Sequence, residues 1–241
     1  MNVTAHKSYD VLVVGAGMVG ATLACALQQC NPDGKYRFLL LESAAIDVSK
    51  KPAQPAYDAR STALSAGSAG YLENLGLWTE LQDYATAIRN IHVSDRGHFG
   101  AVRLHCDDYQ LDALGFVIEN IRLGQVLNRG VTAAPDIELR DATRVVDLMP
   151  IQDGMSVTVE KNGHKQRLEA QLVVLAEGGR SGLCERLGIH HKQTGYGQTA
   201  VIANVSFTDK HANVAFERFT DNGPLALLPL GSHEGDCRAA L

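Results

Sequence analysis

The chain has 241 residues, enough to enclose a sizeable core, and its 22 basic and 27 acidic residues leave a formal net charge of −5. This mild acidity excludes the basic footprint of a nucleic-acid-binding protein, and five cysteines without CxxC spacing exclude a disulfide framework and a cysteine metal site. No signal-peptide pattern opens the sequence and no apolar run is long enough to span a bilayer, so we expect a soluble, cytoplasmic protein without a metal site.

The first predicted unit is a glycine motif between an apolar strand at 9–14 and a helix. In such a GxGxxG motif the first glycine permits a tight turn, the second lets a pyrophosphate approach the backbone, and the third lets helix and strand pack closely. The pyrophosphate would lie against the positive end of the helix. The motif therefore predicts an ADP-containing cofactor, FAD or NAD(P), and its candidate binding residues are Gly15, Ala16, Gly17, Met18, Val19 and Gly20.

The next elements support this interpretation. Apolar residues at helical spacing (Leu23, Ala26, Leu27, Cys30) predict a helix that ends at 31–34, and a buried parallel strand is expected at 36–41. Glu42 follows that strand where dinucleotide folds place the acid that accepts hydrogen bonds from the adenosine ribose. A carboxylate there would repel a 2′-phosphate, which disfavours NADP at this site.

The rest of the chain mixes helices with antiparallel strands. We expect a surface loop at 44–57, a helix after 58–65 that breaks at Gly76, an antiparallel pair 91–93 with 102–104, a helix at 120–129, a hairpin of 155–159 with 166–170, a buried strand at 171–176, and sheet at 201–205, 214–219 and 225–230. The parallel sheet thus resumes only at Leu172, which argues against an ordinary NAD dehydrogenase. An α/β (α+β) fold with a β meander crossing the parallel sheet and an inserted antiparallel sheet fits better.

Three motifs resemble the FAD-dependent aromatic hydroxylases of the p-hydroxybenzoate hydroxylase fold. They are the glycine motif with Glu42, the segment Asp58-Ala59-Arg60-Ser61, and 175–181, which includes Glu177-Gly178 and Arg180. The resemblance implies FAD as cofactor, with Arg60 along its phosphate and ribose. Its implied contacts also include Ser43, Asn120, Glu177 and Gly178. Two of these depart from the family pattern: Glu177 replaces an aspartate, and Asn120 replaces an arginine or glutamine but keeps an amide that can hydrogen-bond the cofactor.

Within that family, 87–98, 108–111, 200–205 and 216–226 resemble the hydroxylases of ubiquinone biosynthesis. This resemblance implies a monooxygenase whose flavin, reduced by NAD(P)H, reacts with O₂ to a C4a-hydroperoxide that hydroxylates a polyprenylated methoxyphenol. It implies no metal and no catalytic side chain that we can name. It also implies other ubiquinone-biosynthesis proteins as partners and peripheral contact with the inner-membrane surface.

We expect a Rossmann-like FAD-binding domain from 1–86 and 116–185, and a substrate-binding β-sheet domain from 87–115 and 186–241. Nothing in the sequence matches the later family segment Gly-Asp-Ala-Ala-His…Gly-Gln-Gly, so a truncated member is expected. Two alternatives stay open: a catalytically inactive fragment that binds FAD or ADP, and an NAD-linked dehydrogenase.

Overall fold

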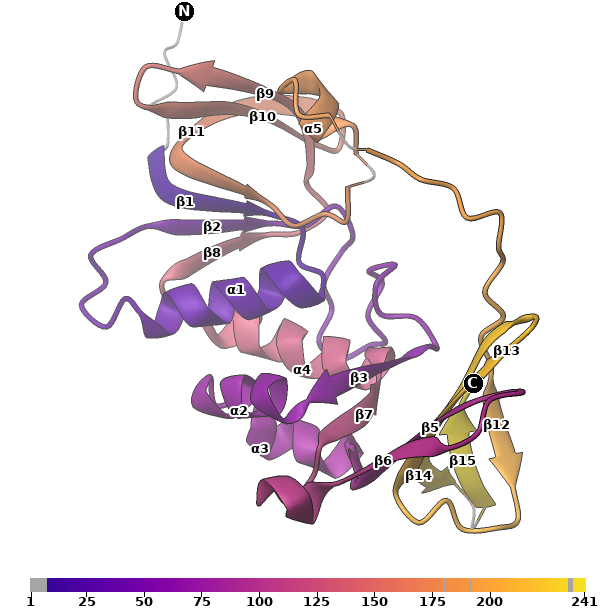
Figure 1. Cartoon of the computed structure of the whole chain (residues 1–241). Helices are drawn as coiled ribbons and strands as arrows, with labels where there is room; N and C mark the ends of the chain where they lie inside the picture. The colour runs from indigo at the N-terminus through magenta and orange to yellow at the C-terminus, as the bar shows by residue number, and fades with distance from the viewer. Residues whose placement is uncertain (1–7, 180, 191, 234–235) are drawn as a thin grey trace, which may run out of the picture. The chain divides into compact units, whose positions relative to one another are not determined.

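A computed structural model describes residues 8–179, 181–190, 192–233 and 236–241 (Figure 1). Its helices are α1 (Met18–Gln29), α2 (Ala66–Asn74), α3 (Trp78–Leu81), α4 (Asn120–Ala133) and α5 (Leu183–Arg186), with short 3₁₀ turns at Gln82–Tyr84 and Cys106–Tyr109. Its strands are β1 (Ser8–Val14), β2 (Phe38–Leu41), β3 (Ser61–Ser65), β4 (Thr86–Ile88), β5 (Asn90–Asp95), β6 (Ala101–His105), β7 (Gly115–Glu119), β8 (Ile137–Arg140), β9 (Arg144–Ile151), β10 (Gly154–Lys161), β11 (His164–Leu175), β12 (Asn204–Phe207), β13 (Val214–Thr220), β14 (Gly223–His233) and β15 (Asp236–Ala240).

The chain divides into two compact units. The first comprises the chain up to Tyr57 together with Gly124–Tyr196, and the second comprises Asp58–Leu123 and Gly197–Leu241. The boundaries expected from the sequence, at 86, 116 and 185, do not coincide with those of the units. The physical reason is that β7 pairs with both β3 and β4, so residues on either side of the expected boundaries share one sheet in the second unit.

The first unit is built on a six-stranded mixed sheet, in the order β8-β2-β1-β11-β10-β9. β8, β2, β1 and β11 are parallel, whereas β10 and β9 add in antiparallel fashion. The long strand β11 connects the parallel and antiparallel parts of this sheet. Its first half pairs with β10, and its second half pairs with β1 in the register Val11↔Leu172. The predicted hairpin, and the return of the parallel sheet at Leu172, are therefore confirmed.

Apolar runs in the strands form the core of this unit, where Leu12, Leu39 and Leu168 are fully buried. Figure 1 shows α1 running along β1 and β2. The helix buries Gly20, Ala21 and Ala24, whereas Leu23 and Leu27 of the predicted apolar spacing are only half-buried and Cys30 is exposed. Small residues make the contact because helix and strand approach closely at the glycine motif.

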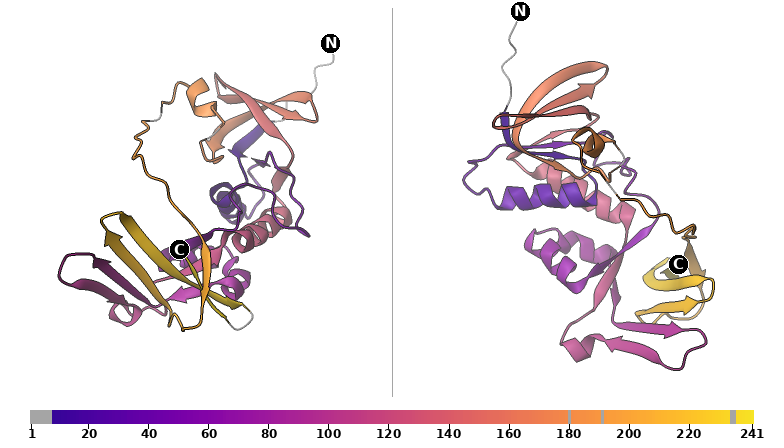
Figure 2. Two further views of the ribbon diagram at one scale, coloured as in Figure 1. Left: turned by 90° about the vertical axis from the view of Figure 1, so that its right-hand side faces the viewer. Right: turned by 45° about the horizontal axis from the view of Figure 1, so that its top comes forward.

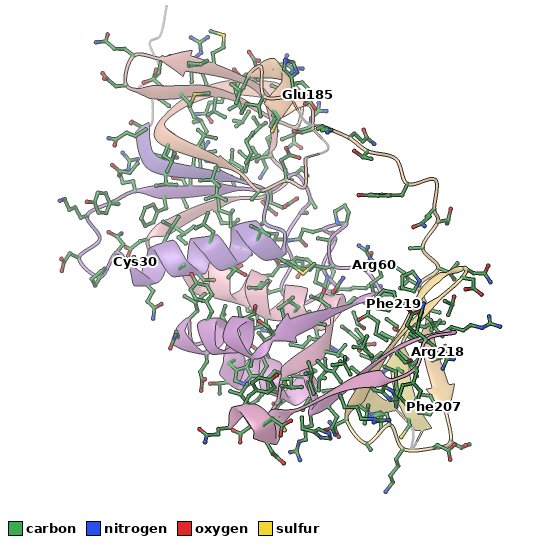
Figure 3. All side chains as sticks on the ribbon, in the orientation of Figure 1. Cys30, Arg60, Glu185, Phe207, Arg218 and Phe219 are labelled. Carbon is green, nitrogen blue, oxygen red and sulfur yellow. The ribbon has the colours of Figure 1, made fainter. Side chains whose placement is uncertain are left out.

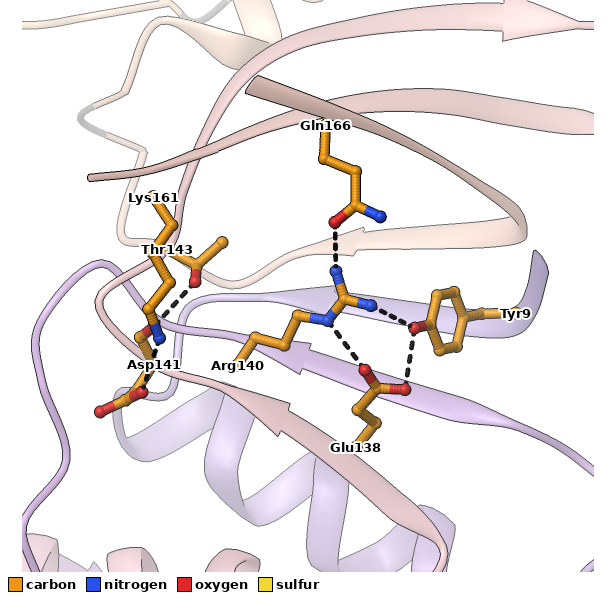
Figure 4. Close-up of polar contacts among 7 residues, drawn as sticks. All are labelled: Tyr9, Glu138, Arg140, Asp141, Thr143, Lys161 and Gln166. Atoms are coloured by element: carbon orange, nitrogen blue, oxygen red, sulfur yellow. Dashed lines mark hydrogen bonds and ion pairs between the residues drawn. The ribbon is translucent and has the colours of Figure 1, made fainter. Parts of the chain in front are cut away.

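A polar network ties β1, β8 and β11 together (Figure 4). The Tyr9 hydroxyl donates to Glu138 Oε2 at 2.9 Å, and the Arg140 guanidinium donates to the Tyr9 oxygen, to Glu138 Oε1 and to Gln166 Oε1 at 2.9, 2.8 and 3.0 Å. Because Tyr9 is buried, its hydroxyl needs these partners. The network fixes the relative position of the strands that lead to the glycine motif.

The second unit holds two sheets: a three-stranded one in the order β3-β7-β4, and a six-stranded one in the order β12-β15-β14-β13-β5-β6. They share a core of Ile88, Val117, Ala215, Leu230 and Ala240. The predicted antiparallel pair is confirmed as β5–β6, with His92 opposite Arg103. Figure 2 shows this hairpin, in magenta, at the edge of its sheet.

One strand was not predicted, and one predicted strand begins later than expected. Ser61–Ser65 forms β3, because these residues pair with β7, and the helix predicted after 58–65 begins at Ala66. That helix breaks at Gly76 as expected, where φ is +73°. The sheet segment predicted at 201–205 begins later, because β12 covers Asn204–Phe207 and, among the described residues before it, Ala203 exchanges hydrogen bonds with Leu241.

Candidate cofactor-binding site

The glycine motif forms a turn in which side chains have no room. Gly15 has φ +98°, a conformation that favours glycine, and a Cβ there would lie 2.9 Å from the Ala176 oxygen. A Cβ on Gly20 would collide with the carbonyl oxygen of Gly15. Gly17 differs, since a Cβ there would make only an ordinary contact with Ala56. The first and third glycines are thus required by packing in the protein itself, whereas the second leaves space above the backbone.

The motif leads directly into the N-terminus of α1. Gly17 is the N-cap and supplies no side-chain hydrogen bond, and the first turn contains no acidic residue. The N–H groups of a first turn lack partners within the helix and carry the positive end of its dipole. Val19 in this turn is 72 % exposed. Together these features make the helix start, at Met18 and Val19, receptive to an anionic group.

Glu42 lies at the end of β2, next to the glycine turn. Its carboxylate is buried and accepts hydrogen bonds from the Ala16 N–H (2.8 Å), the Ala44 N–H (2.8 Å) and the Ser43 hydroxyl (3.1 Å). A carboxylate has about four lone-pair positions, so these three bonds leave room for a further donor. Glu42 thus follows β2 as the spacing predicts, and its hydrogen bond from Ala16 also holds the glycine turn.

Tyr57 was not predicted as a site residue, but its side chain contacts the backbone of the glycine turn. Its buried hydroxyl donates to the Ala16 carbonyl at 3.2 Å, and its ring lies where a Cβ on Gly124 of α4 would be. Burial, with smaller effects from Glu42 and Cys25, raises the pKa of this hydroxyl above its ordinary value. No local pattern marks Tyr57, because its partners are distant in sequence and the residue lies in an irregular loop.

A buried amide pair anchors the loop that carries Tyr57. Gln54 Nε2 donates to Asn128 Oδ1 at 2.9 Å, and Asn128 Nδ2 donates back to Gln54 Oε1 at 3.4 Å. Both side chains are buried, and pairing satisfies groups that would otherwise cost free energy. The expected surface loop at 44–57 is therefore tied into the core near its end.

The segment after β11 also reaches the glycine turn. The Cα of Glu177 would lie 2.9 Å from a Cβ on Gly15, and the Glu177 carboxylate accepts from the Ser181 hydroxyl at 2.8 Å. Gly178 has φ +80° and open space around it. The structure thus brings Glu177 and Gly178 to the turn with Glu42, while Arg180 lies outside the described residues.

In the second unit, Arg60 and Asn120 belong to one polar cluster. Asp58 accepts from Arg60 N–H (2.9 Å) and Arg60 Nε (2.6 Å), and Asn120 Nδ2 lies 3.4 Å from the same carboxylate. Asn120 is buried, donates its N–H to the Arg60 carbonyl (2.8 Å) and accepts from the Thr62 hydroxyl (2.6 Å). The hydrogen bond from the Arg60 N–H is the main cause that lowers the pKa of Asp58.

This cluster leaves donors available. Within the described part of the chain, the half-exposed Arg60 guanidinium pairs with Asp58 through Nε, which leaves its terminal N–H groups for a ligand (Figure 3 labels Arg60). The hydroxyl of Ser61, next in the chain, is buried and has no hydrogen-bond partner among the described residues. These groups fit an oxygen-rich ligand.

Each unit also contains a cavity. The larger, about 700 Å³, lies in the first unit between β9, β10 and α5, and its arginines pair with acids on its own wall: Arg144 with Glu160 and Arg186 with Asp147. The smaller, about 240 Å³, lies in the second unit and is apolar; Phe207, Phe216 and Leu227 are among its lining residues. Among the described residues, His, Cys, Asp and Glu side chains do not gather into a group that could hold a metal ion.

The sequence of this chain is similar to those of several known proteins. The chain is 34 % identical over 233 residues to ubiquinone hydroxylase UbiL of Rhodospirillum rubrum and 30 % identical over 230 residues to the human mitochondrial ubiquinone biosynthesis monooxygenase COQ6. It is 28 % identical over 225 residues to the 3-demethoxyubiquinol 3-hydroxylase of Escherichia coli. These matches cover 94, 92 and 93 % of this chain but 50, 48 and 55 % of the relatives. The chain therefore spans about half the length of the curated relatives it matches.

Solved structures share the fold. The p-nitrophenol 4-monooxygenase PnpA of Pseudomonas putida superposes with a TM-score of 0.69 at 17 % identity, covering 97 % of this chain and 57 % of that one. PqsL of Pseudomonas aeruginosa, described as a probable FAD-dependent monooxygenase, gives 0.73 at 19 % identity, covering 97 % and 59 %. The FAD binding domain model matches residues 8–236. The chain belongs to the FAD binding domain family.

Proposed function

We propose that the first unit binds the ADP half of FAD, and that the protein is a flavoprotein monooxygenase acting on a polyprenylated methoxyphenol of ubiquinone biosynthesis. The observation that carries the proposal is the turn formed by Gly15 and Gly20 with the buried Glu42 beside it. FAD supplies the redox chemistry when bound, and the chain supplies binding, orientation and exclusion of water.

In this proposal each site residue has a task. The α1 start, with Gly17, Met18 and Val19, takes the pyrophosphate, and Glu42 takes a ribose hydroxyl in its free lone-pair position, with Ser43 beside it. Glu177 and Gly178 approach the same ligand from β11. In the second unit, Arg60 and Asn120 offer hydrogen-bond donors suited to phosphate or ribose oxygens, supported by the half-exposed guanidinium.

The overall reaction follows from the proposed class. A ring C–H, O₂ and NAD(P)H with a proton give the ring C–OH, water and NAD(P)⁺, so one oxygen atom enters the product and the other leaves as water. An electron-rich phenol suits this reaction. The apolar cavity of about 240 Å³ in the second unit supports a ring-sized substrate, since an apolar cavity of roughly 150 Å³ accommodates benzene.

Two measurements on the purified chain test the proposal. After incubation with FAD and gel filtration, the visible spectrum should show bound flavin. NAD(P)H oxidation with a prenylated methoxyphenol should then incorporate one labelled oxygen atom from ¹⁸O₂. Bound flavin without product would reduce the function to cofactor binding, and NAD(P)H binding without flavin affinity would contradict the proposal in favour of a dehydrogenase.

A further inference from the structure

The apolar cavity of the second unit is built on one face of the six-stranded sheet. Phe216 and Leu227 lie opposite each other on β13 and β14, and Pro229 lies opposite Ala239 on β14 and β15. Residues two apart on a strand project from the same face, so these four side chains share the surface that lines the cavity. Phe207 of β12 adds a second aromatic ring to the lining. The sheet side of the cavity therefore suits a flat apolar ring.

The loop between β12 and β13 adds the polar side chains of the cavity. Lys210 and His211 are the titratable residues among those that line it. Within the described part of the chain, the exposed Lys210 ammonium has no hydrogen-bond or ion-pair partner. Asp209, next to it in sequence, is not among the lining residues. The cavity thus combines apolar walls with one cation that is free to meet a ligand.

His211, by contrast, is already committed to the fold. Its Nδ1 accepts from the Asn213 N–H at 3.0 Å, so the ring proton lies on Nε2, which donates to the Leu230 carbonyl at 3.1 Å. The Asn213 side-chain amide donates to the Ala87 carbonyl at 2.7 Å. These bonds tie the turn to β14 and β4, so they hold the chain that carries Lys210 beside the cavity. They also leave the imidazole without a nitrogen for a ligand.

The free cation determines what kind of ring the cavity should prefer. A lysine ammonium carries a positive charge and three donors, to which a purely apolar ring offers no acceptor. An ionised oxygen on the ring would accept a charge-assisted hydrogen bond, which is roughly twice as strong as a neutral one. We propose that Lys210 makes this cavity select a phenol, bound as its phenolate, over the same ring with a methoxy group in that position.

This inference rests on the proposed function and deepens it. A methoxyphenol carries both kinds of ring oxygen, and the lysine would distinguish them. The phenolic oxygen would lie at Lys210 and the methoxy group elsewhere, so one side chain would fix how the ring is turned in the cavity. Lys210 would in this way be a specificity-determining residue that contacts the substrate.

Spectrophotometric titration of the full chain with 4-nitrophenol, without flavin, tests this selection. The neutral and ionised forms of this probe absorb at different wavelengths, so its spectrum reports its protonation state while it is bound. The wild-type chain should lower the apparent pKa of the bound probe by at least about one unit, because a neighbouring cation favours the charged form. At a pH where the free phenol is ionised, the chain should bind the O-methyl ether 4-nitroanisole about ten-fold more weakly.

Four variants locate the effect. Lys210→Met should abolish the pKa shift and give the two ligands nearly equal affinities, whereas Lys210→Arg should retain the shift. The matched control is Lys192→Met, which removes an exposed lysine of the first unit and should behave like wild type. Leu227→Trp places a larger side chain in the cavity and should weaken the binding of both ligands. Circular dichroism shows whether each variant is folded.

Four outcomes would overturn the inference. They are a wild-type chain that does not bind 4-nitrophenol saturably, equal affinity for both ligands with no pKa shift, a Lys210→Met chain that keeps the shift, and a folded Leu227→Trp chain that binds like wild type. Because no flavin is present, any of these results leaves the cofactor proposal intact. Failure of the cofactor proposal would instead appear in the FAD spectrum, with the 4-nitrophenol results unchanged.

Discussion

At the residue scale, Glu42 links cofactor choice to the structure of the glycine turn. Its carboxylate holds the Ala16 N–H at 2.8 Å and keeps a lone-pair position for a ribose hydroxyl. A 2′-phosphate in that position would place two negative groups in contact, which costs several kcal/mol at about 4 Å even with partial screening.

The Glu42 carboxylate should make the chain discriminate between two nucleotides that compete with FAD. ADP should displace FAD from the chain at least about ten-fold better than adenosine 2′,5′-bisphosphate, measured by recovery of flavin fluorescence. Glu42→Gln removes the negative charge, so the two nucleotides should displace FAD from this variant with more similar affinities. Exposed Glu185, which is remote from the glycine motif in sequence, provides the matched control as Glu185→Gln. Equal competition by both nucleotides on the wild-type chain would refute the role given to Glu42.

Tyr57 gives stability a pH dependence of known sign. Burial raises the pKa of its hydroxyl, so the folded chain retains this proton where the unfolded chain has lost it. The stabilisation is complete below the unfolded value of about 10 and declines as pH rises through the folded value. Above about pH 10 the free energy of unfolding should fall by up to about 1.4 kcal/mol per pH unit more steeply than in Tyr57→Phe. Urea unfolding from about pH 8 to about pH 11 measures this, and parallel curves for the two proteins would contradict it.

At the element scale, α4 packs through a glycine. A Cβ on Gly124 would overlap the Tyr57 ring, whereas Gly70 of α2 has open space around it. Glycine in a helix costs about 1 kcal/mol relative to alanine, so the packing of Tyr57 opposes helix propensity at Gly124.

The two glycines should therefore respond oppositely to alanine. Gly124→Ala should lower the free energy of unfolding by about 1–2 kcal/mol, since overpacking exceeds the gain in propensity, and Gly70→Ala should raise it by about 0.5–1 kcal/mol. Urea denaturation gives both values. In a Tyr57→Leu background the cost of Gly124→Ala should shrink. Stabilisation by Gly124→Ala would mean that ring and helix are not in contact.

Elements with strong local signals could be predicted from the sequence. Alternation on both sides of Asn162-Gly163 identified the β10–β11 hairpin, because that dipeptide favours the hairpin turn. β3 could not be predicted in this way, since Ser61–Ser65 is a short run of small and polar residues that becomes a strand only through pairing with β7. Spacing predicted that Glu42 follows the strand that became β2, whereas the position of Tyr57 depends on contacts with residues distant in sequence. Contacts between residues distant in sequence determine both the strand β3 and the position of Tyr57, so no local pattern predicts them.

At the scale of the whole molecule, we propose a nucleotide-binding role for the first unit, and the second unit is built on two β-sheets. The first unit has its own core and sheet, and the glycine turn, Glu42, Tyr57 and Glu177 all belong to it. Within the described residues, no helix is long and apolar enough to cross a bilayer.

The most direct test of the central claim is an FAD titration of the purified chain with Gly20→Ala and Gly70→Ala variants. Quenching of flavin fluorescence should report saturable binding to wild type and to Gly70→Ala. Binding to Gly20→Ala should be weaker by at least about 100-fold, because the added Cβ collides with the Gly15 carbonyl and opens the turn. Equal affinity of all three proteins for FAD, or none in any of them, would contradict the assignment of this turn as the cofactor site.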